Sequence, residues 1–227
     1  MSEIRNAVVI GASGGIGAAL VEAREEEDVR VLPLARSFTG DRHLDLENEP
    51  SIAAAAARAG SPDLVIVATG LLHDAEHGPE KALRELDPAW LARQFAVNAI
   101  GPALVAKHFL PVMPKAARSV LAFLSARVGS ITDNRLGGWY GYRASKAALN
   151  QLVRTLAIED KRRNDRGLVV ALHPGTVDTA LSQPFRQAGR DLFKPDRAAV
   201  QLLDVIDGLK VTDSGRHFAW DGSEIAP

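Results

Sequence analysis

The sequence predicts an α/β fold, a single Rossmann-type domain built on a doubly wound parallel sheet with helices on both faces. Short runs of mostly Val, Ile, Leu and Ala alternate with helical patterns, which is typical of parallel strands that helices cover on both sides. A glycine-rich turn lies between the first apolar run and the first helix, as in nucleotide-binding folds of this architecture. The chain has 227 residues, enough for one sizeable core, and no repeat or linker divides it. We therefore expect one domain over 1–227.

The first half of the chain is expected to supply three strands and the helices between them. The glycine-rich turn at 11–17 leads from the first strand into the first helix. The alanine run at 53–57 predicts helix, because alanine is the best helix former. We expect strands over 6–10, 29–35 and 63–68, a first helix ending near Glu27 and a second helix after Pro50.

The second half begins with a clear helix start. Asp87 is a favoured N-cap residue, and Pro88 occupies the first helical position, where its missing N–H costs little. The helix that they open is expected to run to about Met113. Beyond it we expect strands over 118–124, 168–173 and 216–220, and helices over 140–163 and 196–209.

The composition excludes several classes of function. Hydrophobic residues make up 46% and charged residues 24% of the chain, and the formal net charge is −1. Without a basic field, neither a nucleic acid nor an anionic membrane is expected as a partner. The absence of cysteine excludes disulfides, thiol catalysis and cysteine-based metal sites. No signal-peptide core is visible, and charges or prolines interrupt the apolar stretches before membrane-spanning length, so a cytoplasmic protein is expected.

The segment 10–17 has the pattern of a phosphate-binding turn. Gly11, Gly15 and Gly17 give the spacing G-x-x-x-G-x-G. Such glycines allow a tight turn and close approach of a pyrophosphate to the backbone, and the helix that follows offers free N–H groups to phosphate. With Ser13 and Ile16 they are the expected dinucleotide contacts. The alternative is a glycine-rich turn without a ligand.

The end of the second strand bears on which dinucleotide binds. A fold that prefers NAD usually places an acidic residue there to bind the ribose 2′-OH. This chain has no carboxylate over 34–37, and Arg36 can pair with a 2′-phosphate. NADP(H) is therefore favoured over NAD(H), the alternative being an ordinary surface arginine. Asp45 and Leu46 are expected to flank the adenine.

Tyr142 and Lys146 form the candidate catalytic pair. They stand four residues apart in a predicted helix, so their side chains lie on one face. A tyrosine ordinarily titrates near pH ~10, and a lysine cation beside it favours the phenolate and lowers its pKa. Such a pair is a plausible proton-transfer device. The spacing alone leaves open the alternative of a solvated pair on a helix surface.

Together with two further motifs, these features resemble the short-chain dehydrogenase/reductase family over nearly the whole chain. The further motifs are Val97-Asn98-Ala99 and His173-Pro174-Gly175-Thr176-Val177. Within the family the chain is similar to the C-factor/sniffer-like carbonyl reductases. That similarity rests on Gly129-Ser130-Ile131, Gly137-Gly138-Trp139-Tyr140, the segment 142–150 and Asp221-Gly222.

The resemblance implies a role for each matching residue. Tyr142 would be the general acid/base, and Lys146 would lower its pKa and hold the nicotinamide ribose. Asn98 would lie at a break in its long helix and hold a water that relays protons to Lys146. Ser125 would hydrogen-bond the substrate carbonyl and stabilise the developing oxyanion. The further cofactor contacts that the resemblance implies are Ala68, Thr69, Gly70, Pro174, Gly175, Thr176 and Val177.

Three places depart from the family's pattern, and the mildest is Ile10, which replaces the threonine that often opens the glycine loop. The segment 68–70, Ala-Thr-Gly, stands where Asn-Asn-Ala-Gly is common, so an asparagine that stabilises the sheet centre is missing. The family's serine usually occurs as Ser-x-x-Gly, and counting back from Gly129 reaches Ala126 rather than Ser125. A one-residue offset turns a strand side chain to the other face. Either the loop absorbs the shift and Ser125 acts, which we favour, or the serine role is lost. Ser130 is a more remote substitute.

Three further segments leave alternatives open. His73 and His77 are four apart and could share a metal on a helix, but the glycines and proline around them favour a polar loop, so no metal is expected. The segment 178–195 is long enough for a substrate lid, the alternative being a connecting loop. Trp139 and Tyr140 either line the substrate mouth or belong to the core.

The expected function is NADP-dependent hydride transfer between the nicotinamide and a small carbonyl or alcohol substrate, with Tyr142 as general acid/base. The alternative is a nucleotide-binding signalling or regulatory protein of C-factor type with little or no catalysis. The long helices that begin at Pro88 and Tyr140 commonly build oligomers in this family. A homodimer or homotetramer is therefore expected.

Overall fold

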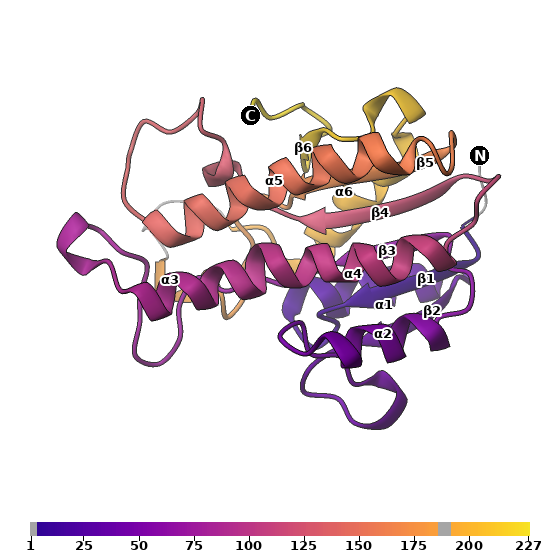
Figure 1. Cartoon of the computed structure of the whole chain (residues 1–227), viewed down its shortest axis with the longest axis horizontal. Helices are drawn as coiled ribbons and strands as arrows, with labels where there is room; N and C mark the ends of the chain where they lie inside the picture. Colours follow the sequence, from indigo (N-terminus) through magenta and orange to yellow (C-terminus); the bar gives the residue numbers. More distant parts are fainter. Residues whose placement is uncertain (1–3, 186–191) are drawn as a thin grey trace.

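A six-stranded parallel sheet forms the middle of the molecule (Figure 1). The computed structural model describes residues 4–185 and 192–227. The strand order is β2-β1-β3-β4-β5-β6, so the predicted doubly wound fold is confirmed. The strands are β1 Asn6–Ile10, β2 Arg30–Leu34, β3 Leu64–Val67, β4 Ser119–Leu124, β5 Gly167–His173 and β6 His217–Ala219.

Helices cover both faces of the sheet, as predicted. Figure 1 shows α2, α4 and α5 on the face toward the viewer, where Phe109 and Leu149 join one core cluster. On the other face Leu20 of α1 and Leu202 of α6 join a second cluster. The helices are α1 Gly15–Glu26, α2 Glu49–Arg58, α3 Pro88–Phe95, α4 Gly101–Phe109, α5 Tyr140–Asp160 and α6 Pro195–Gly208. Shorter turns are η1 Gly40–Arg42, η2 Leu83–Glu85, η3 Ala96–Ile100, η4 Leu110–Val112, η5 Arg127–Gly129, η6 Gln183–Phe185 and η7 Val211–Asp213.

The direction of winding reverses between β1 and β3. From β1 the chain first adds β2 on one side and then β3 on the other, and the later strands extend the sheet beyond β3. In open α/β sheets, ligands bind outside the carboxyl ends of the strands at such a switch point. The loops after β1, β2, β3, β4 and β5 all leave the sheet on that side, so the fold brings them together.

The long helix expected over 88–113 is present but is not one regular α-helix. It runs from α3 through η3, a π-helical turn, into α4 and η4. Its end at Val112 is close to the expected end near Met113. Pro102 lies in the first turn of α4, just after the π turn, where the regular hydrogen-bond ladder is already broken, so its missing N–H does not end the helix.

This continuity corrects one expectation from the sequence. The 25-residue helical run Pro88–Val112 contains an 18-residue window with a mean hydropathy of 1.3, so it is long and apolar enough to cross a membrane by length and composition alone. The expectation that no apolar stretch reaches that length was therefore wrong. Val105, Ala106 and Phe109 of this run are fully buried in the core against the sheet, and a core helix meets the same criteria.

Candidate active site

Three cavities that share lining residues follow the carboxyl ends of the strands. The first cavity, about 310 Å³, lies beside the loops after β1, β2 and β3. The second, about 200 Å³, shares Thr69 and Gly70 with the first and contains Tyr142 and Lys146. The third, about 460 Å³, shares Tyr142 with the second and reaches the segment after β5. They form one continuous cleft over the switch point of the sheet.

The glycine loop after β1 forms one wall of the cleft. Gly11 has a φ of +92°, and a Cβ there would lie 2.8 Å from the Ala68 carbonyl oxygen. A Cβ on Gly17 would collide with the Gly11 carbonyl oxygen. The N-cap residue of α1, Gly14, offers no side chain to accept the N–H groups of the first turn. This bare backbone fits a pyrophosphate, which accepts such N–H groups at close range.

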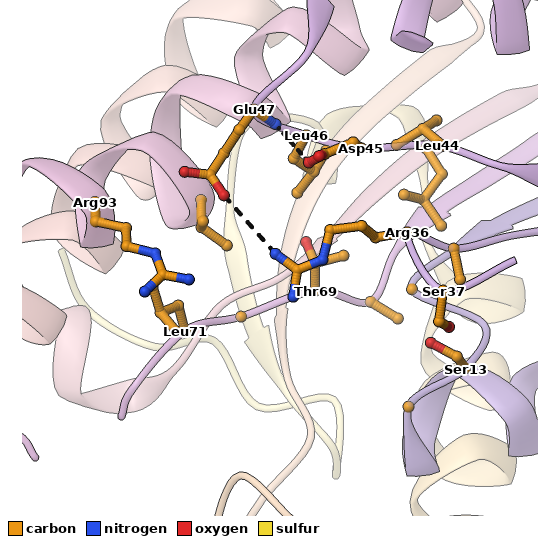
Figure 2. Close-up of a pocket in the computed structure, with 17 residues that line it drawn as sticks. Ser13, Arg36, Ser37, Leu44, Asp45, Leu46, Glu47, Thr69, Leu71 and Arg93 are labelled. Atoms are coloured by element: carbon orange, nitrogen blue, oxygen red, sulfur yellow. Dashed lines mark hydrogen bonds and ion pairs between the residues drawn. The ribbon is translucent and has the colours of Figure 1, made fainter. Parts of the chain in front are cut away.

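Charged side chains from three segments surround the first cavity, as Figure 2 shows. Arg36 comes from the loop after β2, Asp45 and Glu47 from the loop before α2, and Arg93 from α3. Arg36 NH1 lies 3.8 Å from Glu47 Oε2, and the Arg36 side chain is 66% exposed, so its guanidinium stays open to an anion. Sequence reasoning found Arg36, Asp45 and Leu46. It missed Glu47 and Arg93, because contacts between separate segments leave no local signal.

Asn98 is buried inside the π-helical turn η3, so the predicted break in its long helix is confirmed. Its Oδ1 accepts a hydrogen bond from the Leu71 N–H at 2.8 Å, and its Nδ2 donates to the Leu71 carbonyl oxygen at 2.8 Å. Nδ2 also donates to Ser145 Oγ at 3.0 Å. The side chain thus ties the loop after β3 to α5. Its part in a proton relay to Lys146 stays a prediction.

Tyr142 and Lys146 lie together in the wall of the second cavity. They are 7% and 2% exposed, so the pair is not the solvated surface pair that the spacing left open. Lys146 Nζ donates to the Leu124 carbonyl oxygen at 2.8 Å and lies 5.9 Å from the centre of the Tyr142 ring. The end of β4 therefore holds the lysine beside the tyrosine.

Burial sets the protonation of this pair. Desolvation raises the pKa of Tyr142 to about 12 and lowers the pKa of Lys146 to about 7. The lowered Tyr142 pKa expected from the sequence was therefore wrong in direction. A lysine that is itself buried loses much of the charge that would stabilise a phenolate. At neutral pH Tyr142 keeps its proton and is equipped to donate it.

Ser125 shares the walls of the second and third cavities with Tyr142. Its hydroxyl, however, donates to Asn150 Oδ1 of α5 at 2.7 Å. Ala126, the residue that the Ser-x-x-Gly frame selects, lines the third cavity with a methyl group. The Ser125 hydroxyl would have to leave Asn150 to meet a substrate. Its oxyanion role stays a prediction, and this geometry favours the alternative in which that role is lost.

The third cavity has an aromatic wall. The ring centroid of Trp139 lies 6.2 Å from that of Tyr142 and 5.5 Å from that of Phe185. Trp139 therefore lines the side of the cleft next to the candidate acid, whereas Tyr140 is 40% exposed and does not line it. The sequence did not decide whether these two residues line the mouth of the substrate site or belong to the hydrophobic core.

The segment expected to form a lid, 178–195, contributes to the same wall. Its described parts place Leu181, Phe185 and Leu192 around the third cavity. Residues 186–191 lie outside the described part of the chain, and the lid stays a prediction.

Most of the residues that the sequence singled out meet in the cleft. The first cavity is lined by Gly11, Ser13, Arg36, Asp45, Leu46, Ala68, Thr69 and Gly70. The second adds Gly15, Ile16, Ser125, Tyr142, Lys146 and Pro174, and the third adds Gly175, Thr176 and Val177. Gly17 and Asn98 lie behind these walls, where they shape the glycine loop and hold the loop after β3.

Local contacts account for the two histidines of the loop after β3. His77 stacks on Trp90 with ring centroids 4.8 Å apart, and its Nδ1 lies 3.0 Å from Asp74 Oδ1. His73 Nε2 lies 3.3 Å from the Ala180 carbonyl oxygen. Within residues 4–185 and 192–227, no group of three or more His, Cys, Asp or Glu side chains could hold a metal.

Known proteins share this sequence pattern. The family model described as enoyl-(acyl carrier protein) reductase matches residues 11–206. The C-signal protein of Myxococcus xanthus is 39% identical over 145 residues, which are 63% of this chain and 82% of that protein. The 1-hydroxy-2-glutathionyl-2-methyl-3-butene dehydrogenase of Rhodococcus sp. (strain AD45) is 31% identical over 229 residues, which are 95% of this chain and 96% of that enzyme.

A solved structure extends the likeness to the whole fold. The NADPH-bound carbonyl reductase from chicken fatty liver is similar with a TM-score of 0.83 and 25% identity, covering 99% of this chain and 100% of that one. The resemblance to C-factor and to carbonyl reductases is confirmed by these relatives. The family model covers most of the chain and includes the glycine loop, Tyr142 and Lys146. The chain therefore belongs to the short-chain dehydrogenase/reductase family of oxidoreductases.

Proposed function

We propose that the chain is an NADP(H)-dependent reductase of a small carbonyl compound. The observation that carries the proposal is the place of Tyr142, which is buried where the second cavity meets the third. On one side of it lie the glycine loop and Lys146, and on the other the aromatic wall around Trp139. A proton donor at that junction has a cofactor side and a substrate side.

The chain's own residues would manage the proton. A bound nicotinamide would supply the hydride. Tyr142 would donate its phenolic proton to the carbonyl oxygen, and its raised pKa of about 12 keeps that proton in place at neutral pH. Proton donation leaves Tyr142 as a phenolate. Lys146, whose pKa is lowered to about 7, would stabilise that phenolate when its amine carries a proton. A protonated phenol is the acid that carbonyl reduction needs, so the direction favoured is reduction.

The charge around the first cavity supports NADP(H) over NAD(H). Arg36 is exposed beside the cavity, and its contact with Glu47 is long enough to yield to a phosphate. Ser13 and Ser37 line the same cavity and can add hydroxyl groups to such a site. The chicken carbonyl reductase of similar fold was solved with NADPH bound.

The test of the proposal is Tyr142→Phe. We expect turnover of carbonyl substrates to fall by about 10³-fold or more, because the general acid is gone. The dissociation constant for NADPH should stay within about twofold, since the ring and its packing remain. NADPH oxidation across a panel of small ketones and aldehydes measures the first quantity, and a fluorescence titration measures the second.

The matched control is Tyr140→Phe, at the exposed tyrosine in the same helical turn. It removes a phenolic hydroxyl group from a tyrosine two residues before Tyr142, and it should leave turnover unchanged. Equal turnover in wild type and in Tyr142→Phe would contradict the proposal.

A second function has one observation in its favour. The Ser125 hydroxyl is engaged with Asn150 and Ala126 is an alanine, so the cleft lacks a ready hydroxyl partner for Tyr142 at that position. With its likeness to C-signal, the chain could instead be a nucleotide-binding signalling protein with little catalysis. That function predicts tight NADPH binding without oxidation of NADPH by any carbonyl of the panel. The homo-oligomer and the cytoplasmic location expected from the sequence stay predictions.

A further inference from the structure

A buried carboxylate lies outside the proposed chemistry, next to the helix that carries Tyr142. Glu80, in the loop between β3 and α3, is 3% exposed. It makes no ion pair in the part of the chain that the structure describes. A carboxyl group taken out of water needs strong hydrogen bonds in return. Its partners are therefore informative.

Three acceptor atoms of Glu80 hold two other helices. Oε2 accepts a hydrogen bond from the Gly141 N–H at 3.1 Å, and Oε1 accepts one from Gln94 Nε2 of α3 at 2.9 Å. The Glu80 carbonyl oxygen accepts the Trp139 N–H. One residue of a loop thus connects α3 with the first turn of α5.

The first turn of α5 needs such an anchor. Its N-cap residue is Trp139, whose φ of 52° and ψ of 44° are left-handed, and no side chain of its own caps the helix. A left-handed bulky residue is strained, and the first N–H groups of a helix have no partner within the helix. Glu80 supplies acceptors on both sides of the helix start. A carboxylate also interacts favourably with the positive end of the helix dipole.

The packing around Gly141 leaves little freedom for another arrangement. A Cβ on Gly141 would lie 2.5 Å from Gln94 Nε2 and 2.8 Å from Leu91 Cδ2. The Gln94 side chain is completely buried. The backbone at 141 is therefore pressed against α3 at the point where Glu80 binds both.

The anchored turn carries two groups of the cleft. Tyr142 directly follows Gly141, and the Trp139 ring packs 6.2 Å from the Tyr142 ring in the wall of the third cavity. A shift of this turn would move the proton donor and the aromatic wall together. Misplacement of a reacting group by about 1 Å can cost about 100-fold in rate.

We propose that Glu80 is a positioning residue, which fixes the first turn of α5 through Gly141, Trp139 and Gln94 and so places the Tyr142 hydroxyl. The inference rests on the proposed function, in which Tyr142 donates the proton. Glu80 itself does not line any of the three cavities, so it acts through the helix start.

The test compares Glu80→Ala with Glu80→Gln. In Glu80→Ala the Gly141 N–H and Gln94 Nε2 lose their acceptor, and we expect kcat to fall by about 10- to 100-fold with NADPH affinity within about twofold. Glu80→Gln should keep kcat within about threefold. Its amide oxygen can accept the Gly141 N–H, and Gln94 can turn its Oε1, which has no partner among the described residues, toward the new amide N–H.

Glu76→Ala is the matched control, because Glu76 is an exposed glutamate of the same loop. It should leave kcat unchanged. Unchanged kcat in Glu80→Ala, or equal losses in Glu80→Gln and Glu80→Ala, would overturn the inference. If Glu80→Ala does not fold, Gln94→Met is the second variant, because it removes the hydrogen bond between Gln94 Nε2 and Glu80 Oε1. We expect a severalfold loss of kcat in Gln94→Met, and an unchanged kcat would again overturn the inference.

Hydrogen exchange separates this inference from the proposed function. Glu80→Ala should speed amide exchange over 140–146 and leave the exchange of the β-sheet unchanged, whether or not any carbonyl is turned over. If wild type shows no turnover, the proposed function fails while exchange still tests the anchor. Faster exchange with unchanged kcat would make Glu80 a structural cap only and contradict the positioning role.

Discussion

At the scale of single residues, burial determines which groups near the cleft carry charge. Desolvation, with a smaller effect of the nearby Arg127, lowers the pKa of His173 to about 4, although Asp221 acts in the opposite direction. Desolvation likewise lowers the pKa of His217 to about 3, with smaller effects of His173, Arg127 and Lys146. Both histidines end up neutral. The sequence showed His173 only as part of a family motif and did not single out His217, because burial depends on the fold.

His217 makes stability depend on pH. Both of its ring nitrogens are buried without a partner among the described residues. The unfolded chain protonates this histidine below about pH 6.5, whereas the folded chain does not until about pH 3. The contribution of neutral His217 to the free energy of unfolding is therefore fully present above pH 6.5, and it is lost as the pH drops toward 3.

His217→Leu should remove the part of this pH dependence that comes from His217, and the part that comes from His173 should stay. The loss of stability between pH 7.5 and 5.5 should shrink by about 1.4 kcal/mol relative to wild type, the free energy of one pH unit for one proton. Urea unfolding at the two pH values measures it. An unchanged pH dependence in the variant would show that His217 is not buried in its neutral form.

At the scale of elements, the caps and breaks of the helices follow the sequence closely. The predicted N-cap of α3 is confirmed, since Asp87 Oδ1 accepts the Trp90 N–H at 2.7 Å. The π turn at Asn98 was implied by the family resemblance. The helix was expected to run to about Met113, and it does continue past Pro102, because the π turn has already broken the regular hydrogen-bond ladder there.

Asp87→Ala should lower the free energy of unfolding by about 1 kcal/mol, because the helix start loses its side-chain acceptor. Asp87→Asn keeps an acceptor oxygen and should stay close to wild type. Urea unfolding gives both values. Asp41→Ala is the control, at a carboxylate that is 91% exposed, and should have little effect. Equal losses in Asp87→Ala and Asp87→Asn would show that the cap acts through charge rather than through the hydrogen bond.

At the scale of the whole molecule, the cleft connects cofactor binding with global stability. A ligand that binds only the folded chain stabilises it by about 2.7 kcal/mol at 100 times its dissociation constant. NADPH should therefore raise the melting temperature more than NADH at equal concentration. Thermal unfolding with each cofactor measures the difference.

Arg36→Ala should reduce the NADPH effect selectively. Loss of a hydrogen bond to a charged group costs about 1.5–3 kcal/mol, so NADPH affinity should fall about tenfold or more while NADH affinity stays nearly constant. Arg30→Ala is the control, because it removes one positive charge at the start of β2, whereas Arg36 lies in the loop after the end of that strand. Equal weakening of both cofactors by Arg36→Ala would contradict a role in binding the 2′-phosphate.

The sequence by itself determined the order of strands and helices, the glycine loop, the Tyr142 and Lys146 pair and the capped start of α3. These features are local, because each depends on residues within a few positions of one another. Only the tertiary structure decided that burial raises the pKa of Tyr142, that the Ser125 hydroxyl meets Asn150, and that Glu80 holds the start of α5. Those outcomes depend on which segments the sheet brings together, and neither desolvation nor a hydrogen bond between distant segments leaves a periodic mark in the chain.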